Sequence, residues 1–217
     1  MIQAAIFDMD GTLLDSNPYW DKAPAAWLTK LGKRAKPDLA KTIFTMTLPE
    51  ATDYLIGEYG LRQSPGEIIR GINDAMESFY LHDVPLKAGI QNLIRALNDR
   101  GIPCAIASVT DRYLVEKALS RFGLLSSFAA IVTTDDVGVG KNQPDIYLRA
   151  ADLLGSPPEK TLVFEDAPHA IATAKRGNFR TVGIYDEASA DRQDALRADC
   201  DFYLRDYSDF SAILAAL

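Results

Sequence analysis

The chain has 217 residues, 47% of them hydrophobic, so it can bury a sizeable core as one domain or as a core with an insertion. Its net charge of −7 argues against binding to nucleic acid or to an anionic membrane surface through bulk electrostatics. Cys104 and Cys200 lie far apart without metal-ligand spacing, which favours buried thiols in a reducing compartment. Because no apolar run approaches the length of a membrane span or precedes residue 8 as a signal peptide would, we expect a cytoplasmic protein.

The first predicted element is a buried strand over residues 2–7, which is short, apolar and free of glycine. It ends in two carboxylates, Asp8 and Asp10, which alternation along an extended chain directs to the same side. Gly11 then allows a sharp turn, and Thr12 offers a hydroxyl to hold that turn. Like charges this close repel, and a hard divalent cation such as Mg²⁺ would neutralise them. An acidic surface turn is the simpler alternative for an isolated Asp-x-Asp.

Residues 16–85 show helical periodicity and no convincing strand. The helical pattern is broken at residues 32–37, 47–49 and 60–65, which divides this region into four predicted helices. Ser64 and Glu67 have the spacing of a capping box, and Thr47 with Glu50 gives a similar signal for a helix start. We therefore predict an all-helical insertion directly after the first strand, joined to the rest of the chain by two hinge segments.

Beyond residue 85 the pattern alternates between strands and helices. The predicted strands are residues 103–107, 129–132, 161–164, 180–185 and 201–204. The predicted helices are residues 89–100, 111–122, 143–154 and 167–176. This alternation is typical of right-handed βαβ units, so we predict an α/β fold: a doubly wound, Rossmann-like parallel sheet with a small four-helix cap domain. The predicted core domain comprises residues 1–15 and 86–217, and the predicted cap comprises residues 16–85.

Three further strand ends carry polar groups, and in such a sheet neighbouring strand ends can share one site. Ser108 and Thr110 precede a predicted helix, where hydroxyl and backbone N–H groups suit a phosphate, although simple N-capping also explains them. Lys141 follows a glycine in a loop, where a solvated charge is the plain alternative. Glu165 and Asp166 end an apolar strand before a helix, where complementing the helix dipole is the simpler alternative to a functional role.

Taken together, these segments resemble a known family. Asp-Met-Asp-Gly-Thr-Leu-Leu-Asp-Ser after an apolar strand resembles the signature of the haloacid dehalogenase (HAD) superfamily of phosphatases and phosphomutases. Lys141 resembles the lysine of the third motif, with Asn142 where proline is usual, and Glu165 with Asp166 resembles the fourth. Ala-Pro-His follows that pair where serine and a glycine turn are usual, which puts the hydrogen bonds around the metal in question. The four motifs occur in order, each at a predicted strand end.

The resemblance implies the roles of these residues. Asp8 would be the nucleophile that forms an aspartyl-phosphate, and Asp10 would act as general acid and then as general base. Mg²⁺ would be the cofactor, and its expected ligands are Asp8, the backbone carbonyl of Asp10, Asp166 and, directly or through water, Glu165. The groups expected to contact the phosphoryl oxygens are Ser108, Thr110 and Lys141.

The choice between hydrolysis and mutase chemistry depends on the insertion. Relatives resembling β-phosphoglucomutase carry a histidine in the first hinge and an arginine in the cap, where this chain has Trp20 and Leu48. Without a second cationic clamp, water should attack the phospho-enzyme, so we expect a phosphatase for a small monoester, either a sugar phosphate or a nucleotide-like one. Tyr19 and Trp20 could form an aromatic wall for that substrate or simply pack between helices.

Two alternatives remain open: a phosphomutase of the β-phosphoglucomutase type, and a catalytically silent module that binds phosphate ligands. We expect a monomer that binds a small phosphate ester and that binds neither nucleic acid nor a membrane.

Overall fold

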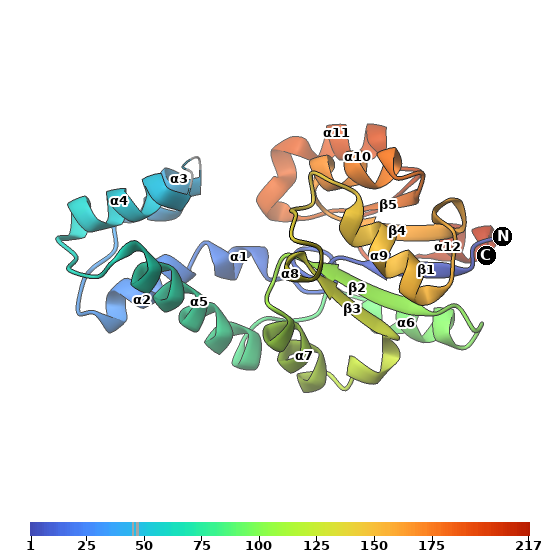
Figure 1. Cartoon of the computed structure of the whole chain (residues 1–217), viewed down its shortest axis with the longest axis horizontal. Coiled ribbons are helices and arrows are strands. Elements are labelled where there is room, and N and C mark those ends of the chain that lie inside the picture. The colour runs from blue at the N-terminus through green and yellow to red at the C-terminus, as the bar shows by residue number, and fades with distance from the viewer. Residues whose placement is uncertain (45, 47) are drawn as a thin grey trace. The chain divides into compact units, whose positions relative to one another are not determined.

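The computed structural model describes residues 1–44, 46 and 48–217, and the predicted helix start at Thr47 lies outside them. The chain divides into two compact units, Met1–Asp15 with Pro85–Leu217 and Ser16–Val84, called here the α/β unit and the helical unit (Figure 1). The helical unit is inserted shortly after the first strand. Its assignment as a separate cap domain stays a prediction.

A parallel sheet forms the centre of the α/β unit. Its strands are β1 (Ala4–Phe7), β2 (Cys104–Ser108), β3 (Ala130–Thr133), β4 (Thr161–Glu165), β5 (Arg180–Ile184) and β6 (Phe202–Leu204). Their spatial order is β3-β2-β1-β4-β5-β6, and every neighbouring pair is parallel. The chain thus builds outward from β1 in both directions, which confirms the predicted doubly wound, Rossmann-like α/β fold.

The central strands are buried because both faces of a parallel sheet are covered in such folds. Side chains alternate between the faces. On one face, Ile6 and Val163 belong to a cluster with Ile146 and Tyr147 of α9 (Asp145–Leu154). On the other face, the rings of Phe7 and Phe164 stack with their centroids 4.2 Å apart. This packing fixes β1 beside β4, the pair of strands on which the candidate site depends.

Helices connect the strands of the α/β unit, and a last helix follows β6. Besides α9 they are α6 (Ile90–Asn98), α7 (Arg112–Arg121), α8 (Thr134–Val137), α10 (Pro168–Arg176), α11 (Gln193–Asp199) and α12 (Ser211–Ala216). Three of these were not predicted: α8, α11 and α12. α8 is a single turn stabilised by a capping box between Thr133 and Asp136, too short to give a periodic signal.

The helical unit contains α1 (Asn17–Trp20), α2 (Ala23–Lys30), α3 (Leu39–Phe44), α4 (Leu48–Tyr59) and α5 (Pro65–His82). The last four correspond to the predicted helices, and α1 is a short addition. The predicted capping box at α5 is confirmed, since Ser64 Oγ accepts from Glu67 N–H (3.4 Å) and the Glu67 carboxylate accepts from Ser64 N–H (2.8 Å). Among the described residues, we find no helix whose length and hydropathy would let it cross a bilayer.

The two chain segments that lead to the helical unit lie side by side within the α/β unit. Asp15 N–H donates to Pro85 O (3.0 Å), and Lys87 N–H donates to Leu13 O (2.9 Å). The Lys87 ammonium bridges the carboxylates of Asp15 (3.2 Å) and of buried Asp186 (2.6 Å), which follows β5. The base of the insertion is thereby fixed to the sheet.

Gly89, just before α6, lies against the backbone of Tyr207, and its substitution tests how tightly the chain packs there. Its φ is +83°, and an added Cβ would lie 2.4 Å from Tyr207 O. Gly89→Ala should lower the free energy of unfolding by about 2–5 kcal/mol, because the left-handed backbone costs an L residue about 1–2 kcal/mol and relieving the clash adds about 1–3 kcal/mol. Gly101→Ala, with φ +70° and nothing within 4 Å, should show only the smaller loss. Equal losses in urea denaturation would contradict this account.

Candidate functional site

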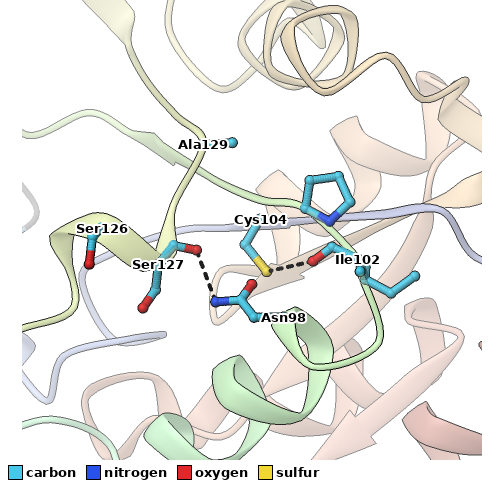
Figure 2. Close-up of a pocket in the computed structure, with 8 residues that line it drawn as sticks. Asn98, Ile102, Cys104, Ser126, Ser127 and Ala129 are labelled. Atoms are coloured by element: carbon cyan, nitrogen blue, oxygen red, sulfur yellow. Dashed lines mark hydrogen bonds between the residues drawn. The ribbon is translucent and has the colours of Figure 1, made fainter.

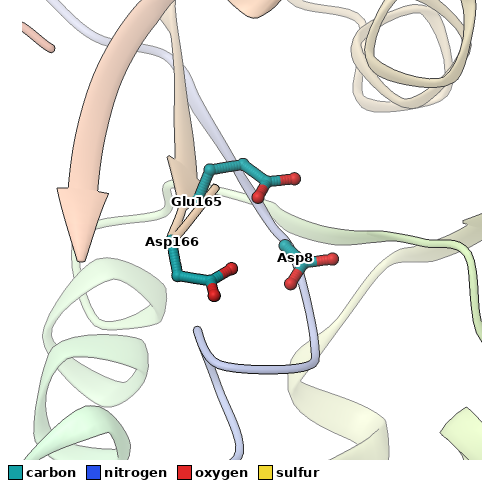
Figure 3. A group of neighbouring side chains, drawn as sticks. All are labelled: Asp8, Glu165 and Asp166. Carbon is teal, nitrogen blue, oxygen red and sulfur yellow. The ribbon is translucent and has the colours of Figure 1, made fainter. Parts of the chain in front are cut away.

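Three buried carboxylates meet beyond the ends of two neighbouring strands. Asp8 directly follows β1, Glu165 ends β4, and Asp166 comes next (Figure 3). Because Phe7 is in register with Phe164, the carboxyl ends of these strands are adjacent. One oxygen from each carboxylate lies within 4.8 Å of the other two. The structure therefore brings together three residues that the sequence predicts as metal ligands, in a set of oxygens that could hold a cation.

The Lys141 ammonium lies among these carboxylates. It is 8% exposed, contacts Asp8 Oδ1, and donates to Glu165 Oε1 at 2.6 Å. The Tyr147 hydroxyl, from α9, donates to the same Glu165 oxygen at 2.8 Å. If all the carboxylates are ionised, one ammonium among three of them leaves two negative charges without compensation. This excess equals the charge of a single divalent cation.

Burial controls the protonation of the cluster. It raises the pKa of Asp8 well above its ordinary value, and the charges of Glu165 and Asp166 raise it further, although Lys141 opposes them. Burial also raises the pKa of Asp166 to about 7, with additional contributions from Glu165 and Asp186. For Lys141, burial disfavours the ammonium, but the Asp8 and Glu165 carboxylates outweigh it, so its pKa is raised. The site therefore favours additional positive charge.

Asp10 has different surroundings from Asp8. Within the part of the chain that the structure describes, its carboxylate is not one of the three clustered ones. It is half-buried, and its Oδ2 accepts a hydrogen bond of 2.6 Å from the Thr110 hydroxyl. Thr110 N–H in turn donates to the hydroxyl of Ser108 (3.0 Å), the fully buried last residue of β2. The loop after β2 thus lies next to the loop after β1, as their pairing requires.

Three contributing residues had no assigned place in the predicted site. The Thr12 hydroxyl donates to Asp166 Oδ1 (3.5 Å), and Tyr207 donates to the carbonyl oxygen of Thr12 (3.0 Å). Tyr147 was recognised only as part of a helix. Thr12 could have been found from its place in the first motif. Tyr207, in contrast, comes from the distant C-terminal segment, where no motif marks it.

The two departures from the expected motifs leave the cluster in place. Asn142 is exposed, and its carbonyl oxygen accepts from the Arg176 guanidinium (2.8 Å), which ties the loop to α10. His169 is exposed on α10. The loop that carries Lys141 is therefore held by a contact that the sequence motif does not include.

The aromatic pair Tyr19 and Trp20 lies in the helical unit. The Tyr19 hydroxyl donates to Asp83 O (3.2 Å), and its ring centroid is 5.3 Å from that of Phe79. The Trp20 indole N–H donates to the Tyr80 hydroxyl (3.2 Å). Both side chains therefore make packing contacts with the end of α5, which is the alternative to the aromatic wall considered above.

A separate hollow of about 440 Å³ lies at the other end of the strands, beside the first residue of β2 (Figure 2). Its wall includes Cys104, whose thiol lies 3.7 Å from Ile102 O, and Asn98, which donates to Ser127 O (3.3 Å). Burial raises the pKa of Cys104 to about 12, so its thiol stays protonated and unreactive. Cys104 is buried as predicted, whereas Cys200 is only half-buried.

The chain is similar in sequence to known phosphatases and shares its fold with solved structures. Hexitol phosphatase B of Escherichia coli (strain K12) is 28% identical over 193 residues, which cover 84% of this chain and 83% of that protein. A phosphorylated carbohydrates phosphatase of Thermotoga maritima is 26% identical over 181 residues, 83% of this chain and 84% of that protein. The β-phosphoglucomutase of Clostridium difficile has the same fold, with a TM-score of 0.74 and 20% identity over 100% of this chain and 97% of that chain.

The family of haloacid dehalogenase-like hydrolases matches residues 2–178. That span contains β1, the Lys141 loop and β4, and so every residue of the acidic cluster and its ammonium. It also covers well over half of the chain. The protein belongs to the haloacid dehalogenase-like hydrolase family.

Proposed function

We propose that this protein is a metal-dependent phosphatase that hydrolyses a small organic phosphate monoester through an aspartyl-phosphate on Asp8. The observation that carries the proposal is the buried cluster of Asp8, Glu165 and Asp166 around the Lys141 ammonium. Relatives named as phosphatases of hexitols and phosphorylated carbohydrates support phosphoric monoester hydrolysis and a small substrate such as a sugar phosphate.

The donor set fits a hard divalent cation, because it consists of carboxylates and carries two uncompensated negative charges when all three are ionised. We propose Mg²⁺, held by Asp8 and Asp166, by Glu165 directly or through water, and by the backbone carbonyl of Asp10. When bound, the ion would neutralise phosphoryl oxygens and reduce repulsion between the substrate and the Asp8 carboxylate.

In the first proposed step, the Asp8 carboxylate attacks phosphorus in line and the bond from phosphorus to the ester oxygen breaks. Asp10 gives its proton to that oxygen, and an alcohol leaves. In the second step, Asp10 takes a proton from water as the water oxygen attacks phosphorus, which releases phosphate and restores Asp8. Asp10 suits this work because its carboxylate is outside the cluster and accepts a hydrogen bond from Thr110.

Lys141 and Ser108 are the proposed contacts for the phosphoryl oxygens. The Lys141 ammonium already lies against Asp8, so it can stabilise charge that moves from the carboxylate to the phosphoryl group. Thr110 was predicted to contact phosphate as well. Because its hydroxyl donates to Asp10 and its N–H to Ser108, we propose that it orients these two residues.

The helical unit Ser16–Val84 is proposed to act as a cap that excludes bulk water during phosphoryl transfer. Its insertion through two adjacent segments, at Asp15 and Pro85, gives it a narrow base on which such a unit can move. A phosphomutase is the second candidate function, supported by the shared fold with β-phosphoglucomutase.

The function is tested by measuring phosphate release from a panel of monoesters that includes hexitol phosphates and 4-nitrophenyl phosphate, with Mg²⁺ or with EDTA. We expect turnover that EDTA abolishes and that Asp8→Asn lowers by more than about a thousandfold. Asp152→Asn, on the exposed side of α9, is the matched control and should keep full activity. No turnover of any monoester would overturn the proposal. Glucose 6-phosphate formed from β-glucose 1-phosphate, followed by NMR, would favour the mutase.

Metal binding is tested apart from activity by thermal unfolding. Mg²⁺ at 100 times its Kd should raise the free energy of unfolding by about 2.7 kcal/mol, because it binds the folded cluster and not the unfolded chain. In Asp166→Asn this Mg²⁺-dependent rise should be largely lost, whereas Asp152→Asn should keep it. An equal rise in both variants would contradict the proposed ligand set.

The role of Thr110 is tested through the leaving group. Thr110→Val should lower kcat/KM for an alkyl phosphate about tenfold or more, because a hydrogen bond to a charged group contributes about 1.5–3 kcal/mol. It should lower kcat/KM for 4-nitrophenyl phosphate much less, since nitrophenolate leaves without a proton and kcat/KM does not include the later hydrolysis step. Thr110→Ser keeps the hydroxyl and should restore kcat/KM. An equal loss of kcat/KM on both esters would contradict a role of Thr110 in protonation of the leaving group by Asp10.

A further inference from the structure

The helical unit contains a partly open cavity of about 420 Å³ that none of the steps above uses. It lies among helices of that unit alone, and its wall includes Trp20 of α1, Ile43 of α3, Leu55 of α4 and Ile72 of α5. Protein interiors are close-packed and keep few voids larger than a water molecule. A hollow of this volume is within the range of small-molecule binding sites.

Among the described residues, the lining of the cavity is apolar apart from Thr52 and Asn73. Thr52 is buried and already has an interaction within the protein, and the Trp20 indole N–H is bonded to Tyr80. Among the described residues, Asn73 is the lining side chain whose amide makes no hydrogen bond. The part of the wall that the structure describes therefore offers a large apolar surface and the Asn73 amide as a hydrogen-bonding group that makes no bond within the protein.

This chemistry selects against polyols. A sugar or hexitol carries a hydroxyl on nearly every carbon, and each hydroxyl that is buried without a partner costs about 1–3 kcal/mol. An aliphatic chain or aromatic ring with one polar function has no such penalty and gains from the burial of its apolar surface. The wall thus matches an apolar ligand better than the carbohydrates named for the relatives.

We infer that this cavity binds a small apolar molecule, aliphatic or aromatic, with one polar group. That group forms a hydrogen bond with the Asn73 side chain. The ligand has two possible sources: the alcohol portion of the phosphate ester, or a separate effector. The first source rests on the proposed phosphatase function and makes an apolar ester, in place of a sugar phosphate, its substrate. The second is independent of that function.

Binding is measured first, with 2-phenylethanol as the probe and erythritol as the polyol comparison, by NMR titration of the full chain. We expect saturable binding of 2-phenylethanol, with shifted resonances around the cavity, and no binding of erythritol. Ala51→Leu fills the cavity and should raise the Kd for 2-phenylethanol at least tenfold. Ala25→Leu, on α2 outside the cavity wall, is the control and should leave that Kd unchanged. If Ala51→Leu does not fold, Ile72→Gln should weaken binding in the same way.

Turnover then separates the two sources. If the ligand is part of the substrate, kcat/KM should favour 2-phenylethyl phosphate over erythritol 4-phosphate at least tenfold, Ala51→Leu should remove that preference, and 2-phenylethanol should inhibit competitively. If the ligand is a separate effector, 2-phenylethanol should bind but none of these three kinetic results should be seen.

Hydrolysis of erythritol 4-phosphate with no binding of 2-phenylethanol would overturn the inference and leave the phosphatase standing. Binding of 2-phenylethanol by a protein that hydrolyses no monoester would overturn the phosphatase alone.

Discussion

The repulsion among Asp8, Glu165 and Asp166 is the constraint on which the rest of this structure depends. Three ionised carboxylates in one buried space repel one another, and the Lys141 ammonium compensates part of their charge. A divalent cation would balance the remaining charge, and we propose that the cluster is a metal site. The same positive charges would make the site attractive to a phosphate ester although the chain as a whole carries a net charge of −7.

The pairing of β1 with β4 brings these carboxylates together. β1 and β4 are far apart in sequence, but they pair in register, so their carboxyl ends deliver Asp8 and the Glu165–Asp166 pair to one place. Ile6 and Val163 pack on one face of these strands, while Phe7 and Phe164 stack on the other. We infer that apolar burial, which stabilises the sheet as a whole, offsets the electrostatic cost at its edge.

The sequence predicts most of this arrangement because strand periodicity and strand-end motifs are local signals. The alternation of elements indicates the doubly wound sheet, and the motifs indicate Asp8, Lys141, Glu165 and Asp166, which the structure brings together. Local signals fail where a contact is made in three dimensions only. The bond from Thr110 to Asp10 and the support from Tyr207 arise from neighbours in space, and α8 is too short for a periodic pattern.

The central claim is that Asp8 accepts the phosphoryl group, and trapping the intermediate tests it most directly. Turnover is stopped by rapid acid quench, and the peptide that contains Asp8 is examined by mass spectrometry for an added phosphoryl group. The account predicts this adduct on Asp8 in the unmodified protein during turnover and its absence once the substrate is exhausted. Turnover with no adduct, or an adduct on another residue, would contradict the account.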